Sequence, residues 1–503
     1  MFPTWFTTNA GLGTIYPAVV LLILVLFFRY YIVISKPLTG TVEWIYRTIS
    51  DKRWNLLREP YPVEKGDILP ICVIVVVFAF LSLGNILAPV HSWPNTTIIA
   101  DGLLYQRGSL IYIHQAWVGS PLGDFLKSFS QDLFGAPALG RQIIAAGFGV
   151  FLPVVTYIFI KILFGKTSVA VCGTLLLGFD FMRFVETSFF SPGIAAAVCI
   201  VLSYLFMYQF MTIDKDMPFK KCVLPLAFSG FFFGLAFSFV WISFFGGLGL
   251  FALFIIRLAA LRGYYRIKYP QGGVFGSYLA KVLLISFVFF VFIPAVIQIL
   301  GHIAVYRNVV SFGDIFGILA DIIAAQRGNL SGLIEPFNYF TQHHALSMSS
   351  LRQMILNLRP IVLHDSFYGD GRSMVLLFGN PMVWWGGFFA MGAMIYRVIK
   401  RKDIRALVIL AGYLSTVIPW IVFSSAQPIN QYFLSVPFLV LALSHVFNTI
   451  ISRGLRRSKQ AVYLFTGATG AVFLKFYPAL TGIYMQQWFF RDFLVWLPGR
   501  WPF

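Results

Sequence analysis

The sequence predicts an all-α polytopic membrane protein that crosses the bilayer about twelve times. The chain has 503 residues, of which 58% are hydrophobic and only 11% are charged. A soluble domain carries roughly 25% charged residues, so a chain this apolar cannot cover itself with polar surface in water. Long apolar stretches such as AVVLLILVLFF and ILPICVIVVVFAFLSLG recur along it. About 20 such residues cross a bilayer as one helix.

Twelve apolar runs mark the expected crossings. They lie near residues 16–35, 68–89, 142–164, 168–186, 191–212, 222–238, 240–260, 279–302, 381–398, 404–424, 428–451 and 461–482. Only a tight turn separates the two runs between 222 and 260. The first run has no basic residue before it and no small-residue cleavage site, so we expect a retained helix rather than a signal peptide.

The net charge of +19 reports orientation rather than nucleic-acid binding. With twelve crossings, one set of alternate connections carries 25 basic and 8 acidic residues, the other set carries 12 basic and 11 acidic residues, and Arg29 lies inside the first helix. Lys and Arg concentrate in the cytoplasmic loops of membrane proteins. Both termini and the two long loops, residues 90–141 and 303–380, are therefore predicted on the non-cytoplasmic side.

The long loops are amphipathic. Runs 314–328 and 346–360 place apolar residues at helical spacing, which predicts helices lying on the membrane surface. The C-terminal run MQQWFFRDFLVWLPGRWPF holds three Trp residues, which is typical of an interfacial segment.

Two classes of protein are not expected. The four cysteines lie in or beside apolar runs, so neither a disulfide framework nor a zinc site is predicted; they are Cys72, Cys172, Cys199 and Cys222. The sequence also lacks a Walker-type phosphate loop, which argues against an ATP-driven transporter.

Ionisable residues inside apolar runs are candidates for function because a membrane makes them costly. Asp180, Arg183 and Glu186 are spaced three residues apart in the outer half of one expected helix, so they would share a face. An internal ion pair between Asp180 and Arg183 is the alternative interpretation. Lys475 and Arg29 are expected to extend toward the interface.

The outer loops hold the other polar candidates. These are Asp101, Arg107, His114 and Asp124 in the first loop, and Arg327, Glu335, His343, His344, Arg352, Arg359, Asp365 and Asp370 in the second. His343 and His344 are adjacent and would point apart on a helix. A solvated or interfacial role is expected for them, and no metal site.

Six stretches, in this order, resemble the protein O-mannosyltransferase family, and its bacterial members most of all. They are SPLGDFLKSFSQDLFG (120–135), LGFDFMRFVETSFF (177–190), GFFFGLAFSFVWISFF (230–245), LRPI (358–361), GNPMVWW (379–385) and INQYFLSVPFLVLALS (429–444). The resemblance runs from about residue 68 to the end. It divides the chain into an extra helix with its cytoplasmic loop, residues 1–67, and a glycosyltransferase-like region, residues 68–503.

The resemblance implies the architecture of C-type membrane glycosyltransferases and an inverting transfer of a sugar, mannose in this family. A Ser or Thr hydroxyl of a translocated protein attacks the sugar, and polyprenyl phosphate leaves. Such a reaction needs a base near the hydroxyl and cationic groups near the phosphate, but no metal and no cofactor. The implied partners are the polyprenyl-phosphate sugar, an acceptor protein or peptide and membrane lipids, with homo- or hetero-oligomers as a further possibility and no nucleic acid. A bacterial plasma membrane is the implied location.

Several polar positions of the family pattern are replaced. Asp101 stands alone where the family has an Asp-Glu pair, and GSPLGD (119–124) replaces a segment with His and Lys. Ser188 and Gly193 stand where the family has Arg and Asp, and Val240 replaces a Lys before Trp. Gln431 precedes Tyr432 where the family usually has His.

We expect Asp101 to be the general base, with Arg359, Arg183, Asp180 and Gln431 around the donor. His343 and His344 are expected near the acceptor. The alternatives are an ordinary loop carboxylate or helix cap for Asp101, and a headgroup anchor for Arg359. For the whole chain they are an inactive relative that acts as a partner subunit or lipid-sugar binder, and an unrelated transporter.

Overall fold

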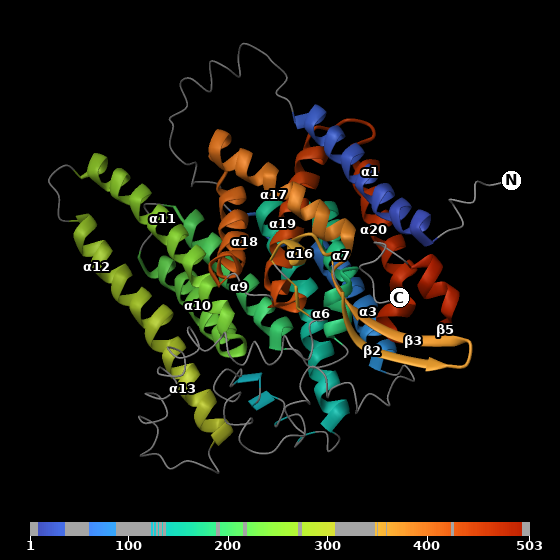
Figure 1. Ribbon diagram of the computed structural model, residues 1–503. Coiled ribbons are helices and arrows are strands. Elements are labelled where there is room, and N and C mark those ends of the chain that lie inside the picture. Colours follow the sequence, from blue (N-terminus) through green and yellow to red (C-terminus); the bar gives the residue numbers. More distant parts are fainter. Residues whose placement is uncertain are drawn as a thin grey trace.

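The fold is a bundle of long helices with two small sheets at one end (Figure 1). A computed structural model describes residues 9–35, 60–86, 122–123, 125–126, 129, 133, 137–187, 192–214, 219–269, 274–306, 348–349, 351–358, 360–423 and 427–494.

A helix lies at each of the twelve predicted crossings. The helices are α1 (Asn9–Ser35), α3 (Ile68–Ile86), α6 (Pro137–Phe164), α7 (Thr167–Gly178), α8 (Phe181–Glu186), α9 (Pro192–Thr212), α10 (Phe219–Phe239), α11 (Gly246–Lys268), α12 (Val274–Phe287), α13 (Ile293–Tyr306), α17 (Pro381–Arg401), α18 (Ile404–Phe423), α19 (Val436–Ser452) and α20 (Ser458–Thr481). Within the described residues, eight helical runs are long and apolar enough to cross a membrane. Shorter apolar runs lie at Ala18–Tyr31, Thr167–Gly178 and Ile404–Ile418.

Two junctions between helices are short. The predicted turn near residue 240 is a 3-10 segment, Trp241–Phe245, between α10 and α11. A π-helical segment, Val288–Phe292, joins α12 to α13 and makes them one long helix.

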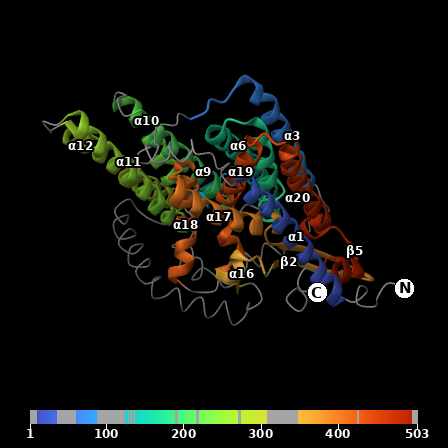
Figure 2. The same ribbon diagram turned by 90° about the horizontal axis from the view of Figure 1, so that it is seen from above.

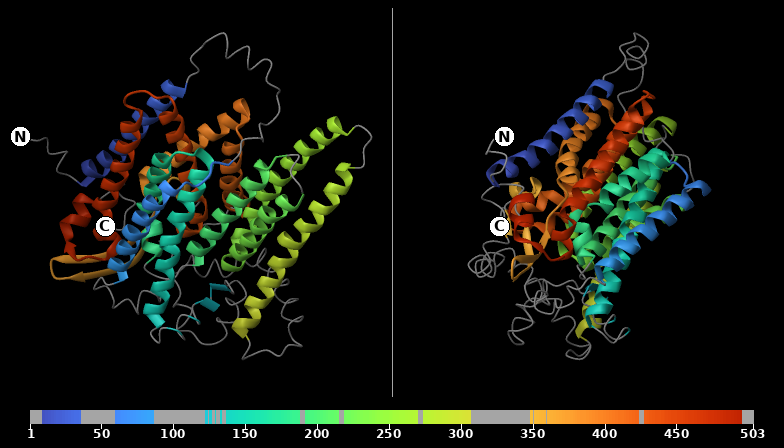
Figure 3. Two further views of the ribbon diagram at one scale, coloured as in Figure 1. Left: turned by 180° about the vertical axis from the view of Figure 1, so that it is seen from behind. Right: turned by 90° about the vertical axis from the view of Figure 1, so that its right-hand side faces the viewer.

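The helices form a centre and two flanks. In the most apolar stretches of α9 and of Tyr432–Ser452, 83% of the residues are buried, against 11% in that of Phe275–Leu300. Figures 1 and 2 show α11 and α12 at one edge of the bundle and α1 and α20 at the other. The left view of Figure 3 shows the same two groups on opposite sides of the bundle. An apolar edge such as α12–α13 suits a protein whose outer surface meets lipid.

A β-hairpin lies at the end of the bundle where α17 begins, which we call the hairpin end. Strands β2 (Ile361–Tyr368) and β3 (Gly371–Leu377) pair antiparallel, with a register shift between Val362 and His364. Strand β5 (Met485–Gln486) extends the sheet beside β3. A separate pair joins β1 (Met348–Ser349) to β4 (Gln427–Pro428).

These sheets correct one expectation. The surface helix predicted over 346–360 is only five residues long, α16 (Leu351–Ile355), and neither sheet was predicted. Run 314–328 lies outside the described residues. Within the tail, β5 is followed by a π-helical turn, Phe489–Phe493, and residues 495–503 lie outside the described part.

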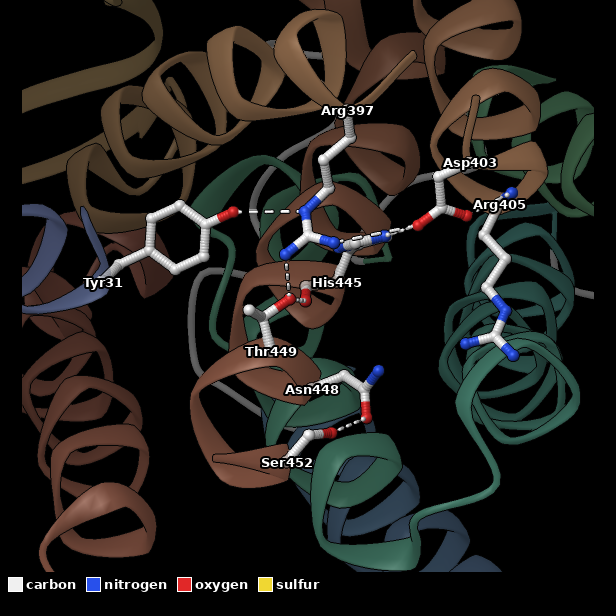
Figure 4. Close-up of polar contacts among 8 residues, drawn as sticks. All are labelled: Tyr31, Arg397, Asp403, Arg405, His445, Asn448, Thr449 and Ser452. Atoms are coloured by element: carbon white, nitrogen blue, oxygen red, sulfur yellow. Dashed lines mark hydrogen bonds and ion pairs between the residues drawn. The ribbon is translucent and has the colours of Figure 1, made fainter. Parts of the chain in front are cut away.

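A cluster of buried polar residues closes the opposite end of the bundle, which we call the Asp403 end (Figure 4). His445 Nε2 lies 3.0 Å from Asp403 Oδ2, and Arg397 Nη1 lies 3.9 Å from the same oxygen. Arg397 also donates to the Tyr31 hydroxyl at 3.3 Å and to Thr449 Oγ1 at 2.8 Å. The cluster therefore ties α1, α17 and α19 together.

Candidate functional site

Asp180 interrupts the helix that was predicted over 168–186. Helix α7 ends at Gly178, and α8 begins at Phe181 with Asp180 as its N-cap. Asp180 Oδ1 accepts the backbone N–H of Arg183 at 3.2 Å. Asp is a favoured N-cap because its carboxylate satisfies an N–H that the first helical turn leaves unpaired. The expected common face of Asp180, Arg183 and Glu186 is therefore wrong, because the first of them lies outside the helix.

The second carboxylate oxygen of Asp180 binds the beginning of α17. Oδ2 accepts the backbone N–H of Asn380 at 3.1 Å and the indole N–H of Trp384 at 2.9 Å. Asp180 is fully buried. A buried carboxylate is stable only when such donors replace water, so these contacts fix α8 to α17.

Asn380 returns the contact. Its Oδ1 caps α17 by accepting the Met382 N–H at 3.1 Å, and Pro381 occupies the first turn. Its Nδ2 donates to the carbonyls of Phe179 at 2.9 Å and Thr469 at 3.2 Å. The N-cap residues of α8 and α17 are thus hydrogen-bonded to each other, and Asn380 also binds α20 through Thr469.

The Arg183 guanidinium binds backbone carbonyls rather than the Asp180 carboxylate. It donates to the carbonyl oxygens of Gly149 and Gly178, each at 2.9 Å, and lies 4.8 Å from the centre of the Phe78 ring. The alternative of an Asp180–Arg183 side-chain ion pair is therefore not found. Both side chains are 0% exposed, so neither offers an open face to a ligand here.

Asn357 binds the chain just before α17. Its Nδ2 donates to the Gly379 carbonyl at 2.6 Å, and its Oδ1 accepts the Gly379 N–H at 3.0 Å. Trp385 Nε1 donates to the Leu356 carbonyl at 2.7 Å. Leu356 and Asn357 are thus held against the beginning of α17.

Trp384 also contacts the segment that carries Gln431. Its ring centre lies 4.9 Å from that of Tyr432, and the Tyr432 hydroxyl lies 2.8 Å from the Tyr413 hydroxyl. Gln431 belongs to a 3-10 segment, Ile429–Ser435, which leads into α19. The side chain of Gln431 is outside the described set.

Four of the six stretches that carry the family resemblance therefore meet or adjoin at the hairpin end. They are 177–190, 358–361, 379–385 and 429–444. Of the predicted site residues, the structure describes Asp180 and Arg183 fully. Asp101, His343, His344 and Arg359 lie outside the described residues.

Sequence reasoning missed Asn357, Asn380 and Trp384. Asn380 carried a readable signal, because Asn followed by Pro is typical of a helix N-cap and first position. Asn357 and Trp384 act through residues distant in the chain, and nothing in the local sequence marks those partners.

An apolar groove runs along the bundle surface between α3 and α7. Its volume is about 350 Å³, and its lining includes Leu69, Val73, Val77, Phe78, Val171 and Leu175. Only aliphatic and aromatic side chains line it, so it suits a hydrocarbon chain. Phe78 connects this groove to Arg183.

Comparisons with known proteins identify relatives. The family described as dolichyl-phosphate-mannose-protein mannosyltransferase matches residues 112–305. The polyprenol-phosphate-mannose–protein mannosyltransferase of Corynebacterium glutamicum is 24% identical over 456 residues, which cover 82% of this chain and 85% of that protein. The protein of the same name from Mycobacterium tuberculosis strain H37Rv is 29% identical over 133 residues, which cover 25% of each chain.

One solved structure has a similar fold. It is the Saccharomyces cerevisiae protein O-mannosyltransferase Pmt1–Pmt2 complex bound to the sugar donor, with a TM-score of 0.68. The match covers 88% of this chain and 93% of that chain at 12% identity. The chain is therefore similar in sequence to polyprenol-phosphate-mannose–protein mannosyltransferases over most of its length and has the multi-pass membrane fold of the Pmt1–Pmt2 structure.

Proposed function

We propose that the protein is a membrane glycosyltransferase that transfers a sugar, mannose, from polyprenyl phosphate to a Ser or Thr hydroxyl of a protein. The observation that carries this proposal is the match to the C. glutamicum mannosyltransferase over 82% of the chain. Contacts among three family segments at the hairpin end support it, because they hold residues from distant parts of the chain in one place.

The reaction is an inverting displacement. The acceptor oxygen forms a bond with the anomeric carbon, the bond from that carbon to the phosphate oxygen breaks, and its electron pair leaves with the phosphate. The hydroxyl proton passes to a carboxylate base. We assign this base to Asp101.

Cationic and amide groups stabilise the departing phosphate. We assign contacts with the donor to Arg359 and Gln431, and contacts with the acceptor to His343 and His344. Asp180 and Arg183 support the donor site without touching the donor, because their buried contacts hold α8 against α17.

We also propose an orientation and a setting. The hairpin end faces the non-cytoplasmic side of a bacterial plasma membrane, as do both termini and the loops 90–141 and 303–380, because the basic residues concentrate in the opposite connections. Residues 68–503 form the transferase, and residues 1–67 add one helix and a cytoplasmic loop. The relative of known structure is a complex of two proteins, and we infer that this chain also forms an oligomer.

The test is turnover by the purified full-length protein. With polyprenyl-phosphate mannose and a Ser/Thr peptide, wild type should release polyprenyl phosphate and mannosylate the peptide. Asp101→Asn should lower kcat by at least ~100-fold, since a general base contributes about that much. Asp370→Asn, a change at an exposed carboxylate in the hairpin turn, should leave turnover unchanged.

Equal turnover in Asp101→Asn and wild type would remove Asp101 as the base. The replaced positions Ser188, Gly193 and Val240 favour a second candidate, an inactive relative that binds lipid-linked sugar. That candidate requires wild type to bind the donor, seen as protection from proteolysis, without transferring sugar from any donor. Solute movement across sealed vesicles without sugar transfer would instead indicate a transporter.

A further inference from the structure

Asn357 has a left-handed backbone conformation, which glycine adopts more readily than asparagine. Its φ is 54°, in the left-handed region, and the residue is only 2% exposed. Among the described residues, Lys402 is the other non-glycine residue with positive φ, and it closes the end of α17 in an exposed position. Glycine is the ordinary choice for this conformation, so the Asn357 amide needs an explanation of its own.

The amide of Asn357 pairs with both backbone groups of one residue. Donating to the Gly379 carbonyl and accepting from the Gly379 N–H, it forms a closed pair of hydrogen bonds at 2.6 and 3.0 Å. Only a side-chain amide offers a donor and an acceptor with this geometry. The Trp385 indole holds the neighbouring Leu356 carbonyl at 2.7 Å. Two adjacent residues are therefore fixed to the beginning of α17.

That beginning is itself fixed. The residue after Gly379 is Asn380, whose N–H binds the buried Asp180 and whose side chain binds Phe179 and Thr469. Asn357 is thus connected, through Gly379, to the core of the bundle. A group that must be placed within a fraction of an ångström is best carried by such a rigid support.

We propose that Asn357 is a positioning residue for donor binding. It holds Leu356 and Asn357 against the beginning of α17, and so fixes the chain that leads to Arg359, the residue assigned to the donor phosphate. This inference rests on the proposed transferase function and on the assignment of Arg359 to the donor. Asn357 itself touches neither substrate.

The test compares two substitutions, which distinguish the effect of losing the side-chain amide from the effect of straining the backbone. Asn357→Gly keeps the left-handed conformation and removes the amide, whereas Asn357→Ala removes the amide and strains the backbone. With polyprenyl-phosphate mannose and a Ser/Thr peptide, both variants should raise the donor KM about tenfold, as expected for two lost hydrogen bonds. The peptide KM and kcat should each stay within about twofold. Both variants should lower the unfolding temperature, and Asn357→Ala should lower it further because it also strains the backbone.

Trp385→Phe provides an independent variant, because it removes the contact with Leu356 and keeps an aromatic ring. It should raise the donor KM in the same direction. Trp420→Phe is the matched control: this buried indole N–H has no hydrogen-bond partner among the described residues, and its loss should leave the donor KM unchanged.

The outcomes separate the inference from the function on which it rests. Wild-type turnover with an unchanged donor KM in Asn357→Gly overturns the positioning role alone. An effect on the unfolding temperature without one on the donor KM assigns Asn357 a purely structural role and overturns it equally. A wild-type protein that neither binds nor uses the donor overturns both proposals.

Discussion

At the scale of single residues, Asp180 has the most demanding environment at the hairpin end. Its carboxylate is fully buried and accepts three N–H groups, from Arg183, Asn380 and Trp384. Two of these donors belong to a helix that begins 200 residues later in the chain. A charge in such a site is tolerated because every contact is a charge-assisted hydrogen bond.

Asp180→Asn should destabilise the protein by about 1–3 kcal/mol, because the amide turns an NH₂ group toward N–H donors and leaves one of them unpaired. The measurement is unfolding of the detergent-solubilised protein, followed by Trp fluorescence. The exposed Asp370→Asn change should leave the unfolding midpoint in place. A midpoint equal to wild type for Asp180→Asn would show that the buried carboxylate contributes nothing to stability.

At the scale of elements, the contacts of Asp403 hold the turn between α17 and α18 against α19. Asp403 lies between α17 and α18 and accepts from His445 and from the Arg405 backbone N–H. Burial raises the pKa of Asp403, but the contacts with His445 and Arg397 outweigh it and hold that pKa well below its usual value of 3.8. The carboxylate is therefore ionised throughout the physiological range.

A lowered pKa in the folded state fixes the sign of the pH dependence. The stabilisation from Asp403 is complete above the unfolded-state pKa and is lost only as the pH falls through the lower folded-state pKa. Asp403→Asn should therefore destabilise the protein by about 1–3 kcal/mol, and the difference from wild type should be constant from pH 8 to about pH 5. It should shrink below about pH 4.

The same unfolding assay checks this over a pH series. Asp492 provides the comparison, because its ion pair with Arg491 is exposed, and exposed pairs contribute about 0–1 kcal/mol. Asp492→Asn should thus have little effect at any pH. A difference between Asp403→Asn and wild type that grows as the pH falls would contradict the assigned direction of the shift.

The long helices could be read from the sequence, because apolar length is a local property. All twelve predicted crossings contain a helix. The break at Phe179–Asp180 could not be read from the sequence, because it depends on the contacts of Asp180 with Asn380 and Trp384, which are distant in the chain. The hairpin was missed because Ile361–Leu377 follows an amphipathic run that reads as helix, although YGDG at its centre is a turn signal. Most predicted ligand contacts fall outside the described residues and remain predictions.

At the scale of the whole molecule, the two buried clusters define two different ends. Helix α17 begins at the Asp180 cluster and ends at the Asp403 cluster. Because α17 crosses the membrane once, the two clusters lie near opposite faces. The orientation of the whole bundle is therefore known once one of the two ends has been assigned to a side of the membrane.

That assignment can be made by labelling. In a background without the four native cysteines, Asp370→Cys and Arg456→Cys place single thiols at exposed positions of the hairpin turn and of the α19–α20 connection. In intact cells, an impermeant maleimide should label the first and not the second, because basic connections stay in the cytoplasm. The reverse pattern would overturn the proposed orientation, and disruption of the membrane should make both thiols reactive.

The contact between Asp180 and α17 also sets an order for biogenesis. Membrane proteins are inserted from the N-terminus while synthesis continues, yet Asp180 meets Asn380 and Trp384 only after 200 further residues have been added. Until then its carboxylate has no indole or α17 amide to bind and must stay hydrated at the membrane surface. The eight crossings that precede α17 therefore enter the membrane before the contacts at the hairpin end can form, and the arrival of α17 completes those contacts.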